Sequence, residues 1–152
     1  MSNESFDFTA VFGTLPKLDD VKNAIQNCQK FSELNDSDLL PNYAATVAKT
    51  IKVTSTQLNR FYRYVKSIEQ ANRMSNPDAT TANDGFIDKH KLKFLLPKIA
   101  GSSERDSLKE LYEIFAVSTP KIKTVSDLRT FVEFFEAILD YHSTFDTKKK
   151  DK

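Results

Sequence analysis

Few side chains in this sequence are of the types that carry out catalysis. There are two histidines, His90 and His142, and a single cysteine, Cys28. The spacing places Cys28 and His142 on apolar helix faces, which predicts a packed thiol and a structural histidine. His90 lies in a lysine-rich stretch, at the surface or in a groove. One cysteine allows neither an intramolecular disulfide nor a cysteine-based zinc site.

Three carboxylates, Glu133, Glu136 and Asp140, have the i, i+3, i+7 spacing of one helix face. A carboxylate metal site would need Glu-x-x-His pairs on facing helices, and the sequence has none, so we interpret the three as solvated or salt-bridged. The loop ending at Asp84 and Gly85 lacks acidic ligands where a calcium loop requires them. HExxH, CxxC, GxGxxG, P-loop and GxSxG motifs are missing. The sequence therefore predicts no enzyme activity, no metal and no cofactor.

The clearest chemical signal is the uneven distribution of positive charge. Residues 39–68 contain no Asp or Glu, and neither do residues 89–103. The whole chain carries +1 and these segments carry +9, so the remainder carries −8. The cations are Lys49, Lys52, Arg60, Arg63 and Lys66 in the first segment, and Lys89, Lys91, Lys93 and Lys98 in the second.

One helix face in the first segment has the composition of a phosphate-binding surface. A Thr-x-x-Gln capping box at Thr54 predicts a helix start, and at 100° per residue Thr56, Arg60 and Ser67 then point away from the buried side. Arg63 lies at the edge of the same arc. Lysine, arginine, serine and threonine are the side chains that contact phosphates. The alternative is an ordinary solvated helix face.

Helical periodicity runs through the chain and predicts the elements that position these cations. Apolar residues at i, i+3, i+4 spacing predict helices over 18–31, 40–48, from 54 to the loop of 75–85, over 86–100, from 108 to before Pro120, and over 126–145. The helix over 86–100 is apolar around most of its circumference, so we expect it to be central and heavily buried. Pro97 should kink or shorten it, and Gly101 should cap it. Ser126 is the expected N-cap of the last helix.

These patterns predict an all-α fold. We expect a compact bundle of five to six helices over residues 17–146, with a loose N-terminal arm (1–16) and a disordered Lys-rich C-terminal tail (147–152). A stretch near Val11 is the only strand-like candidate. The start of the chain lacks signal-peptide features and no apolar run is long enough to span a membrane, so we expect a cytoplasmic protein without a membrane partner.

Three segments, in this order, resemble the small subunit of the type III-A CRISPR–Cas (Csm) interference complex. They are TSTQLNRFY at residues 54–62, LLPKIA at 95–100 with Arg105 shortly after, and FVEFFEAILDYH at 131–142. The resemblance covers about Leu39 to His142, and the residues before it look like an extension. Asn59 stands where the family has arginine, and Gly101 where it has tyrosine.

The resemblance implies a non-catalytic role in antiviral defence. Several copies would stack along the backbone subunits, and the expected partners are guide RNA, target RNA, the backbone and large subunits of the Csm complex, and further copies of this chain. Contacts would be to phosphates, without sequence readout. The residues expected to bind RNA are Lys49, Lys52, Gln57, Arg60, Arg63, Lys91, Lys93, Lys98 and Arg105.

Two other functions stay open. The chain could be a helical protein–protein adaptor whose basic faces meet acidic partners; RNA binding that weakens steeply with salt would separate the two. It could also be a helix-turn-helix DNA-binding regulator, because Gln57, Asn59 and Arg60 open a helix closely after Val53. A preference for one duplex DNA sequence would support that reading.

Overall fold

Every regular element that the structure describes is helical, which confirms the predicted all-α fold. The structure is a computed structural model, and it describes residues 16–34, 39–75, 91–101 and 108–150. Within them it has six α-helices, three short 3-10 helices and no β-strand. They are α2 (Leu18–Asn27), η1 (Phe31–Leu34), α3 (Leu39–Thr50), α4 (Ser55–Ser75), η2 (Leu92–Phe94), α5 (Leu95–Ala100), α6 (Lys109–Ser118), η3 (Thr119–Lys121) and α7 (Val125–Lys150). The predicted arm up to residue 15, the stretch near Val11, the loop at Asp84 and Gly85, His90 and Arg105 lie outside the described residues.

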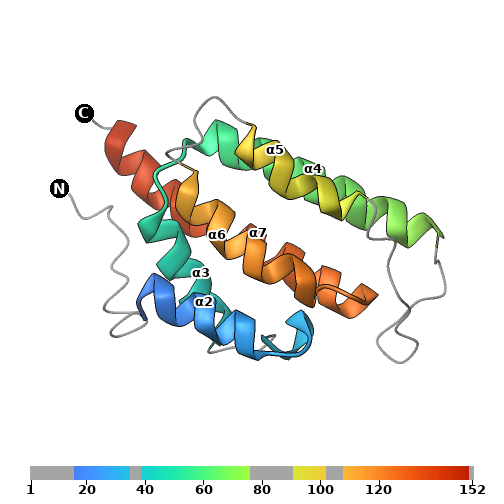
Figure 1. Cartoon of the computed structure of the whole chain (residues 1–152). Coiled ribbons are helices and arrows are strands. Elements are labelled where there is room, and N and C mark those ends of the chain that lie inside the picture. The colour runs from blue at the N-terminus through green and yellow to red at the C-terminus, as the bar shows by residue number, and fades with distance from the viewer. Residues whose placement is uncertain (1–15, 35–38, 76–90, 102–107, 151–152) are drawn as a thin grey trace.

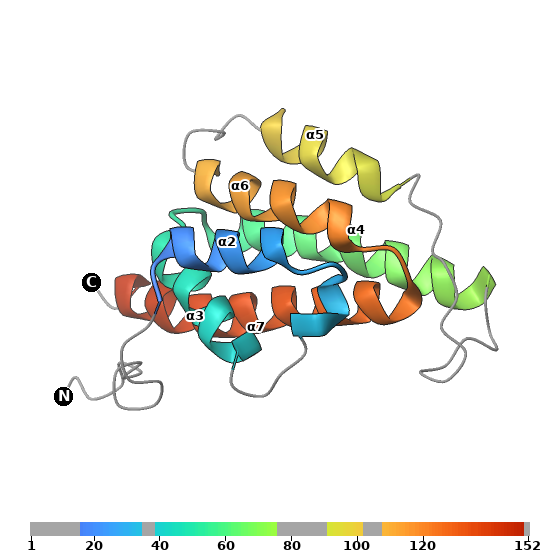
Figure 2. The ribbon, with the colours of Figure 1, turned by 60° about the horizontal axis from the view of Figure 1, so that its bottom comes forward.

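The long helix α7 is the centre of the bundle. It packs against α3, α4 and η1, and it runs the length of the molecule in both ribbon views (Figures 1 and 2). Phe131, Phe134, Phe135 and Ile138 on its inner face are at most 1% exposed. The ring of Phe115 from α6 packs against Phe131 at 5.2 Å and against Phe135 at 5.0 Å between centroids. The described core is therefore rich in phenylalanine, and α7 supplies three of its six buried phenylalanines.

The prediction that the helix over 86–100 is central is wrong. The described part of this segment, η2 followed by α5, packs on α4 and α6 at the edge of the bundle (Figure 2). Leu92, Leu95 and Ile99 are buried, but Phe94 is 50% exposed. The segment carries more apolar surface than one edge contact can cover. Pro97 lies in the first turn of α5, where the missing N–H is tolerated.

The predicted end of this segment is confirmed. Gly101 is the C-cap of α5, and its N–H donates to the Pro97 carbonyl at 2.8 Å. Its backbone angles are right-handed (φ −84°), so the turn itself does not demand glycine. A Cβ at this position would lie 3.1 Å from the Pro97 oxygen, which is a tight contact.

The N-terminal helix α2 and the short η1 belong to the core. Val21, Ile25 and Phe31 are fully buried, and Lys22 Nζ donates to Glu113 Oε1 on α6 at 3.1 Å. The helix predicted to reach residue 31 ends at Asn27, and η1 forms separately after a short break.

The cysteine that follows α2 is a packed thiol, as predicted. Cys28 is buried, and its Sγ–H donates to the Ile25 carbonyl at 3.0 Å. Burial raises the pKa of this thiol, which keeps it protonated and unreactive.

The N-cap of α7 is two residues earlier than predicted, because Thr124 and not Ser126 caps the helix. Thr124 Oγ1 accepts from the Asp127 N–H at 3.4 Å, and Asp127 Oδ2 accepts from the Thr124 N–H at 3.1 Å, which is a reciprocal capping box. Asp127 also accepts from the Lys123 N–H at 3.0 Å and from the Ser32 N–H at 2.9 Å. This fully buried carboxylate therefore joins η1 to α7. At its other end α7 continues to Lys150, through most of the predicted tail.

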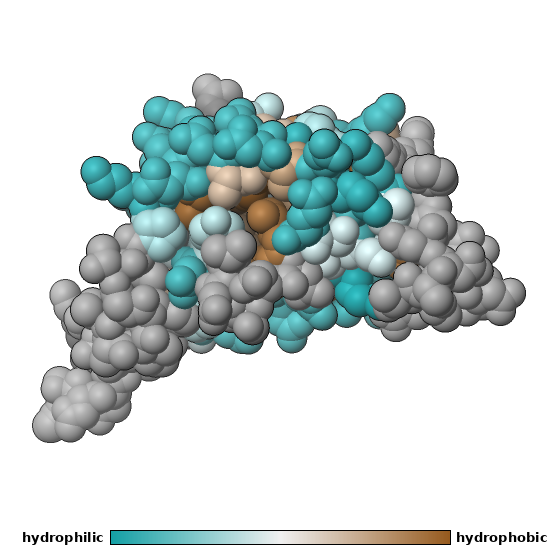
Figure 3. Space-filling model, turned by 90° about the horizontal axis from the view of Figure 1, so that it is seen from below, coloured by the Kyte–Doolittle hydropathy of each residue, from teal (hydrophilic) through white to brown (hydrophobic). Residues whose placement is uncertain are grey.

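The face formed around α2 and α3 is largely polar. Seen from below the view of Figure 1, hydrophilic side chains lie above and beside a hydrophobic patch (Figure 3). The helices α4 and α5 lie at the top of Figure 1, on the side turned away from this view. Among the described helices, none is both long enough and apolar enough to cross a membrane.

Candidate nucleic-acid interface

Helix α4 presents the first group of predicted cations. Its first turn is capped by Thr54, whose Oγ1 accepts from the Gln57 N–H at 3.1 Å. Leu58, Phe61, Val65 and Ile68 face the core. The opposite arc is exposed, and it contains Thr56, Arg60, Arg63 and Ser67 as predicted.

The charges on α4 differ in how far they are neutralised. Lys66 Nζ lies 3.1 Å from Glu69 Oε1, so this lysine is paired within its own helix. In the part of the chain that the structure describes, neither Arg60 nor Arg63 forms an ion pair with a carboxylate. The two arginines therefore keep their full charge toward solvent.

A tyrosine brings the second basic segment against α4. Tyr64 Oη donates to the Lys91 carbonyl at 2.6 Å, and Lys98 Nζ lies 4.8 Å from the centre of the Tyr64 ring in a cation–π contact. Both ribbon views show α5 running antiparallel to α4 (Figures 1 and 2). Two acid-free segments that are distant in sequence are thus in contact. We use the term basic face for the exposed cations of the two segments, Arg60, Arg63, Lys91 and Lys98, together with Tyr64.

The other predicted residues lie at different places. Lys49 and Lys52 are exposed at the end of α3 and in the connection of residues 51–54, directly before α4. Gln57 is only 7% exposed, so its side chain does not belong to this surface. Lys93 is exposed on the other side of α5, toward η3.

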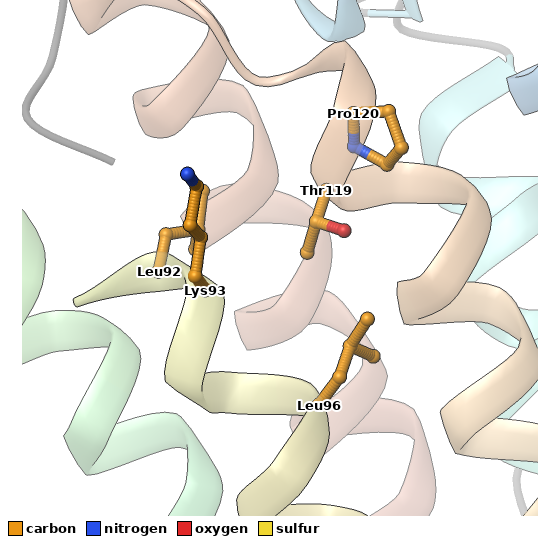
Figure 4. A pocket seen from close by; sticks show the side chains of 5 residues that line it. All are labelled: Leu92, Lys93, Leu96, Thr119 and Pro120. Carbon is orange, nitrogen blue, oxygen red and sulfur yellow. The ribbon is translucent and has the colours of Figure 1, made fainter. Parts of the chain in front are cut away.

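Lys93 borders a shallow hollow of about 270 Å³ between η2, α5 and η3. Figure 4 shows its lining, with Leu92, Lys93 and Leu96 on one side and Thr119 and Pro120 on the other. One hydroxyl and one ammonium group are the polar functions among these five side chains. Within the described ranges, no group of three or more His, Cys, Asp and Glu side chains is placed to hold a metal ion.

The remaining candidate residues have structural surroundings. His142 is 4% exposed, and its Nε2 lies 2.9 Å from the Val53 carbonyl, which confirms the predicted structural histidine. That distance fixes the ring proton on Nε2, because a carbonyl only accepts. Glu133, Glu136 and Asp140 are exposed on the outer face of α7. Burial first, and then the charge of Glu136, raise the pKa of Tyr62 on α4, so acidic α7 borders α4 on that side.

Sequence reasoning missed the contacts of Tyr64 and the exposure of Phe94. Tyr64 is half-buried at the border of the core-facing arc of α4, where periodicity alone leaves its role undecided. Phe94 was expected in the core. An aromatic residue within an acid-free basic stretch was the available signal for both.

Comparison with known families identifies the family of the chain. A family model described as Csm2 Type III-A matches residues 34–148. The chain belongs to this family. Membership supports a small subunit of a type III-A CRISPR complex, and the matched region contains both halves of the basic face. Helix α2 and most of η1 precede the match. No curated protein and no solved structure matches the chain.

Proposed function

We propose that this chain is a non-catalytic, RNA-binding small subunit of a cytoplasmic type III-A CRISPR effector complex. Copies of it would stack beside the backbone subunits and bind guide RNA and target RNA through phosphates. The observation that carries the proposal is the joining of two acid-free segments into the basic face by Tyr64. Lys49, Lys52 and Arg105 are further candidates for contact with the same RNA.

The physical basis is neutralisation of a phosphate backbone. Arg60 and Arg63 offer planar guanidinium groups that bind phosphate through two hydrogen bonds, while Lys91 and Lys98 act as point charges. Bound cations release counterions from the RNA, so affinity falls as salt rises. Such contacts position RNA without reading its sequence, which suits a subunit of a complex in which base pairing supplies specificity.

The test is a double variant, Arg60→Ala with Arg63→Ala, in the full chain. We expect weaker binding to labelled single-stranded RNA, by a similar factor for unrelated sequences. The slope of log affinity against log salt should become shallower by roughly 1.4, since each phosphate contact contributes about 0.7 for a single strand. Fluorescence anisotropy over a salt series measures both quantities.

The matched control removes two cations elsewhere. Lys109 on α6 and Arg129 on α7 are also exposed, so Lys109→Ala with Arg129→Ala changes the net charge equally and should leave the slope nearly unchanged. An equal loss in both double variants would mean that only the net charge matters. An unaltered slope in the first variant would remove α4 from the RNA interface.

The two other functions predict different results. An adaptor would capture acidic proteins with no salt-steep RNA binding. A helix-turn-helix regulator would prefer one DNA duplex, and the burial of Gln57 takes a base-reading side chain away from the start of α4.

The long outer face of acidic side chains on α7 suits contact with basic surfaces of neighbouring subunits or copies.

A further inference from the structure

One tyrosine contacts both ends of the second basic segment. Tyr64 on α4 donates its hydroxyl hydrogen to the Lys91 carbonyl, at 2.6 Å, where η2 begins. The ammonium group of Lys98, in the last turn of α5, lies 4.8 Å from the centre of the Tyr64 ring. A single side chain therefore holds the segment through two chemically different contacts, and each contact can be removed without the other.

The hydroxyl contact holds the start of η2 against α4. The same Lys91 carbonyl also accepts from the Phe94 N–H at 3.1 Å, within the turn of η2. Burial raises the pKa of the Tyr64 hydroxyl, so the group stays protonated and donates at neutral pH. Leu95 and Ile99 are fully buried and hold the inner side of α5 in the core. The tyrosine therefore adds an anchor at the border with solvent.

The ring contact keeps Lys98 close to the arginines of α4. Tyr64 directly follows Arg63 and is four residues after Arg60, and i, i+4 positions are neighbours on a helix surface. Lys98 is exposed, and within the described ranges no carboxylate pairs with it. An ammonium group has three N–H donors, so a phosphate oxygen can still accept from Lys98 while the ring holds it.

We propose that Tyr64 is a positioning residue of the RNA-binding surface. The inference rests on the proposed RNA-binding function and adds to it the residue that sets the arrangement of the cations. Tyr64 acts through Lys98, whose flexible side chain would otherwise have to be ordered by the RNA. Ordering a long side chain on binding lowers affinity, and a lysine that is already held over a ring loses less freedom when RNA binds.

Two substitutions separate the hydroxyl from the ring. Tyr64→Phe removes the bond to the Lys91 carbonyl and keeps the ring, whereas Tyr64→Leu removes both and leaves the net charge unchanged. Ordering one long side chain corresponds to a factor of about two to ten in affinity. We therefore expect Tyr64→Leu to bind labelled single-stranded RNA about fivefold more weakly than Tyr64→Phe, as measured by fluorescence anisotropy at one fixed salt concentration.

The decisive step repeats this comparison without the lysine. In a Lys98→Ala background the ring has no cation to hold, so Tyr64→Phe and Tyr64→Leu should bind RNA within about twofold of each other. In a Lys98→Arg background the fivefold difference should persist, because arginine also stacks on an aromatic face. A ring that only supported the fold would lower affinity by the same factor in all three backgrounds.

The controls address folding and unrelated tyrosines. Urea unfolding shows whether each variant is folded under the binding conditions. Tyr64→Met replaces Tyr64→Leu if the latter is not, since methionine also lacks a ring and fills irregular gaps. Tyr112 on α6 is exposed as well, so Tyr112→Phe and Tyr112→Leu are the matched pair and should bind RNA as the unaltered chain does.

The outcomes distinguish this inference from the function on which it rests. If the unaltered chain binds RNA and Tyr64→Leu binds it as tightly, or the loss is the same with and without Lys98, the positioning role is overturned and the phosphate contacts stand. A loss with Tyr64→Phe as large as with Tyr64→Leu would assign the effect to the hydroxyl and overturn the role of the ring. No RNA binding by the unaltered chain at low salt overturns both the proposed function and this inference.

Discussion

Replacing Asp127 by asparagine tests how the bundle is tied together. The carboxylate is fully buried and accepts from the N–H groups of Ser32, Lys123 and Thr124 at 2.9, 3.0 and 3.1 Å. A hydrogen bond to a charged group contributes about 1.5–3 kcal/mol, and loss of a helix cap costs about 1 kcal/mol. An asparagine oxygen still accepts part of this set. We therefore expect Asp127→Asn to lower the free energy of unfolding by about 2–3 kcal/mol.

The effect should depend on pH in a definite direction. Burial by itself raises the pKa of Asp127, but the hydrogen bonds from Ser32, Lys123 and Thr124 outweigh it and hold the pKa below the ordinary value of 3.8. The charged form is thus favoured by folding. Its stabilisation is complete above the unfolded-state pKa and is lost as the pH falls through the lower, folded-state pKa. The difference in free energy of unfolding between the unaltered chain and Asp127→Asn should therefore become smaller in acid.

Urea unfolding followed by circular dichroism, at about pH 7 and about pH 3, measures both effects. Glu133→Gln is the control, since this carboxylate is exposed on the same helix and should change stability by less than about 0.5 kcal/mol. A loss under about 0.5 kcal/mol for Asp127→Asn at neutral pH would refute the reasoning. So would a difference between Asp127→Asn and the unaltered chain that is as large in acid as at neutral pH.

Two further substitutions probe the core. Phe135→Ala removes a fully buried ring that packs on Phe115 at 5.0 Å and on Tyr62 at 5.4 Å, and it should cost about 3–5 kcal/mol in urea unfolding; under about 1 kcal/mol would mean that α7 packs differently. His142→Ala leaves the Val53 carbonyl without its 2.9 Å partner, so we expect the free energy of unfolding to fall by about 1–3 kcal/mol. Relative to the unaltered chain, amide exchange should speed up more in the first turn of α4 than in α6. An equal increase in the two helices would argue against this role of His142.

The exposed side of α4 was predictable from sequence because the spacing of apolar residues within one helix gives its buried and exposed sides. Once Thr54 marked the start of a helix, the positions of Leu58, Phe61 and Val65 fixed its inner side and left Arg60 outside. The capping box and the acid-free composition are local signals, and the local geometry of a helix does not depend on what packs against it.

The position of α5 was not predictable in the same way. The segment has the apolar composition of a central helix, with Leu92, Leu95, Leu96 and Ile99. A position at the edge of the bundle is nevertheless enough to cover most of these side chains. The central position goes to α7, since its 26 residues offer a phenylalanine-lined face long enough to contact α3, α4 and η1 at once. The length of a helix decides which of the two occupies the centre of the bundle. Hydrophobic periodicity describes the faces of a helix but not this choice.

Burial of Gln57 has a related cause. The side chain sits at the edge of the core-facing arc of α4, next to Leu58, and polar residues at such edges are covered or exposed according to the neighbouring helix. Sequence periodicity gives the angle of a residue on its own helix but not the partner across from it. The same limit concealed Tyr64, whose role depends on α5 running beside α4.

The segment that precedes the family match is needed for the fold on which the basic face depends. Val21, Ile25 and Phe31 are fully buried, and burying each such side chain contributes about 1.5–3 kcal/mol. Their sum approaches the whole stability of a typical domain, about 5–15 kcal/mol. Since α2 packs on α6, and α6 in turn packs on α5, removing these residues would loosen the support beneath the lysines of the basic face. The arginines on α4 rest on α7 and would be affected less, so the two halves of the basic face depend on different parts of the core.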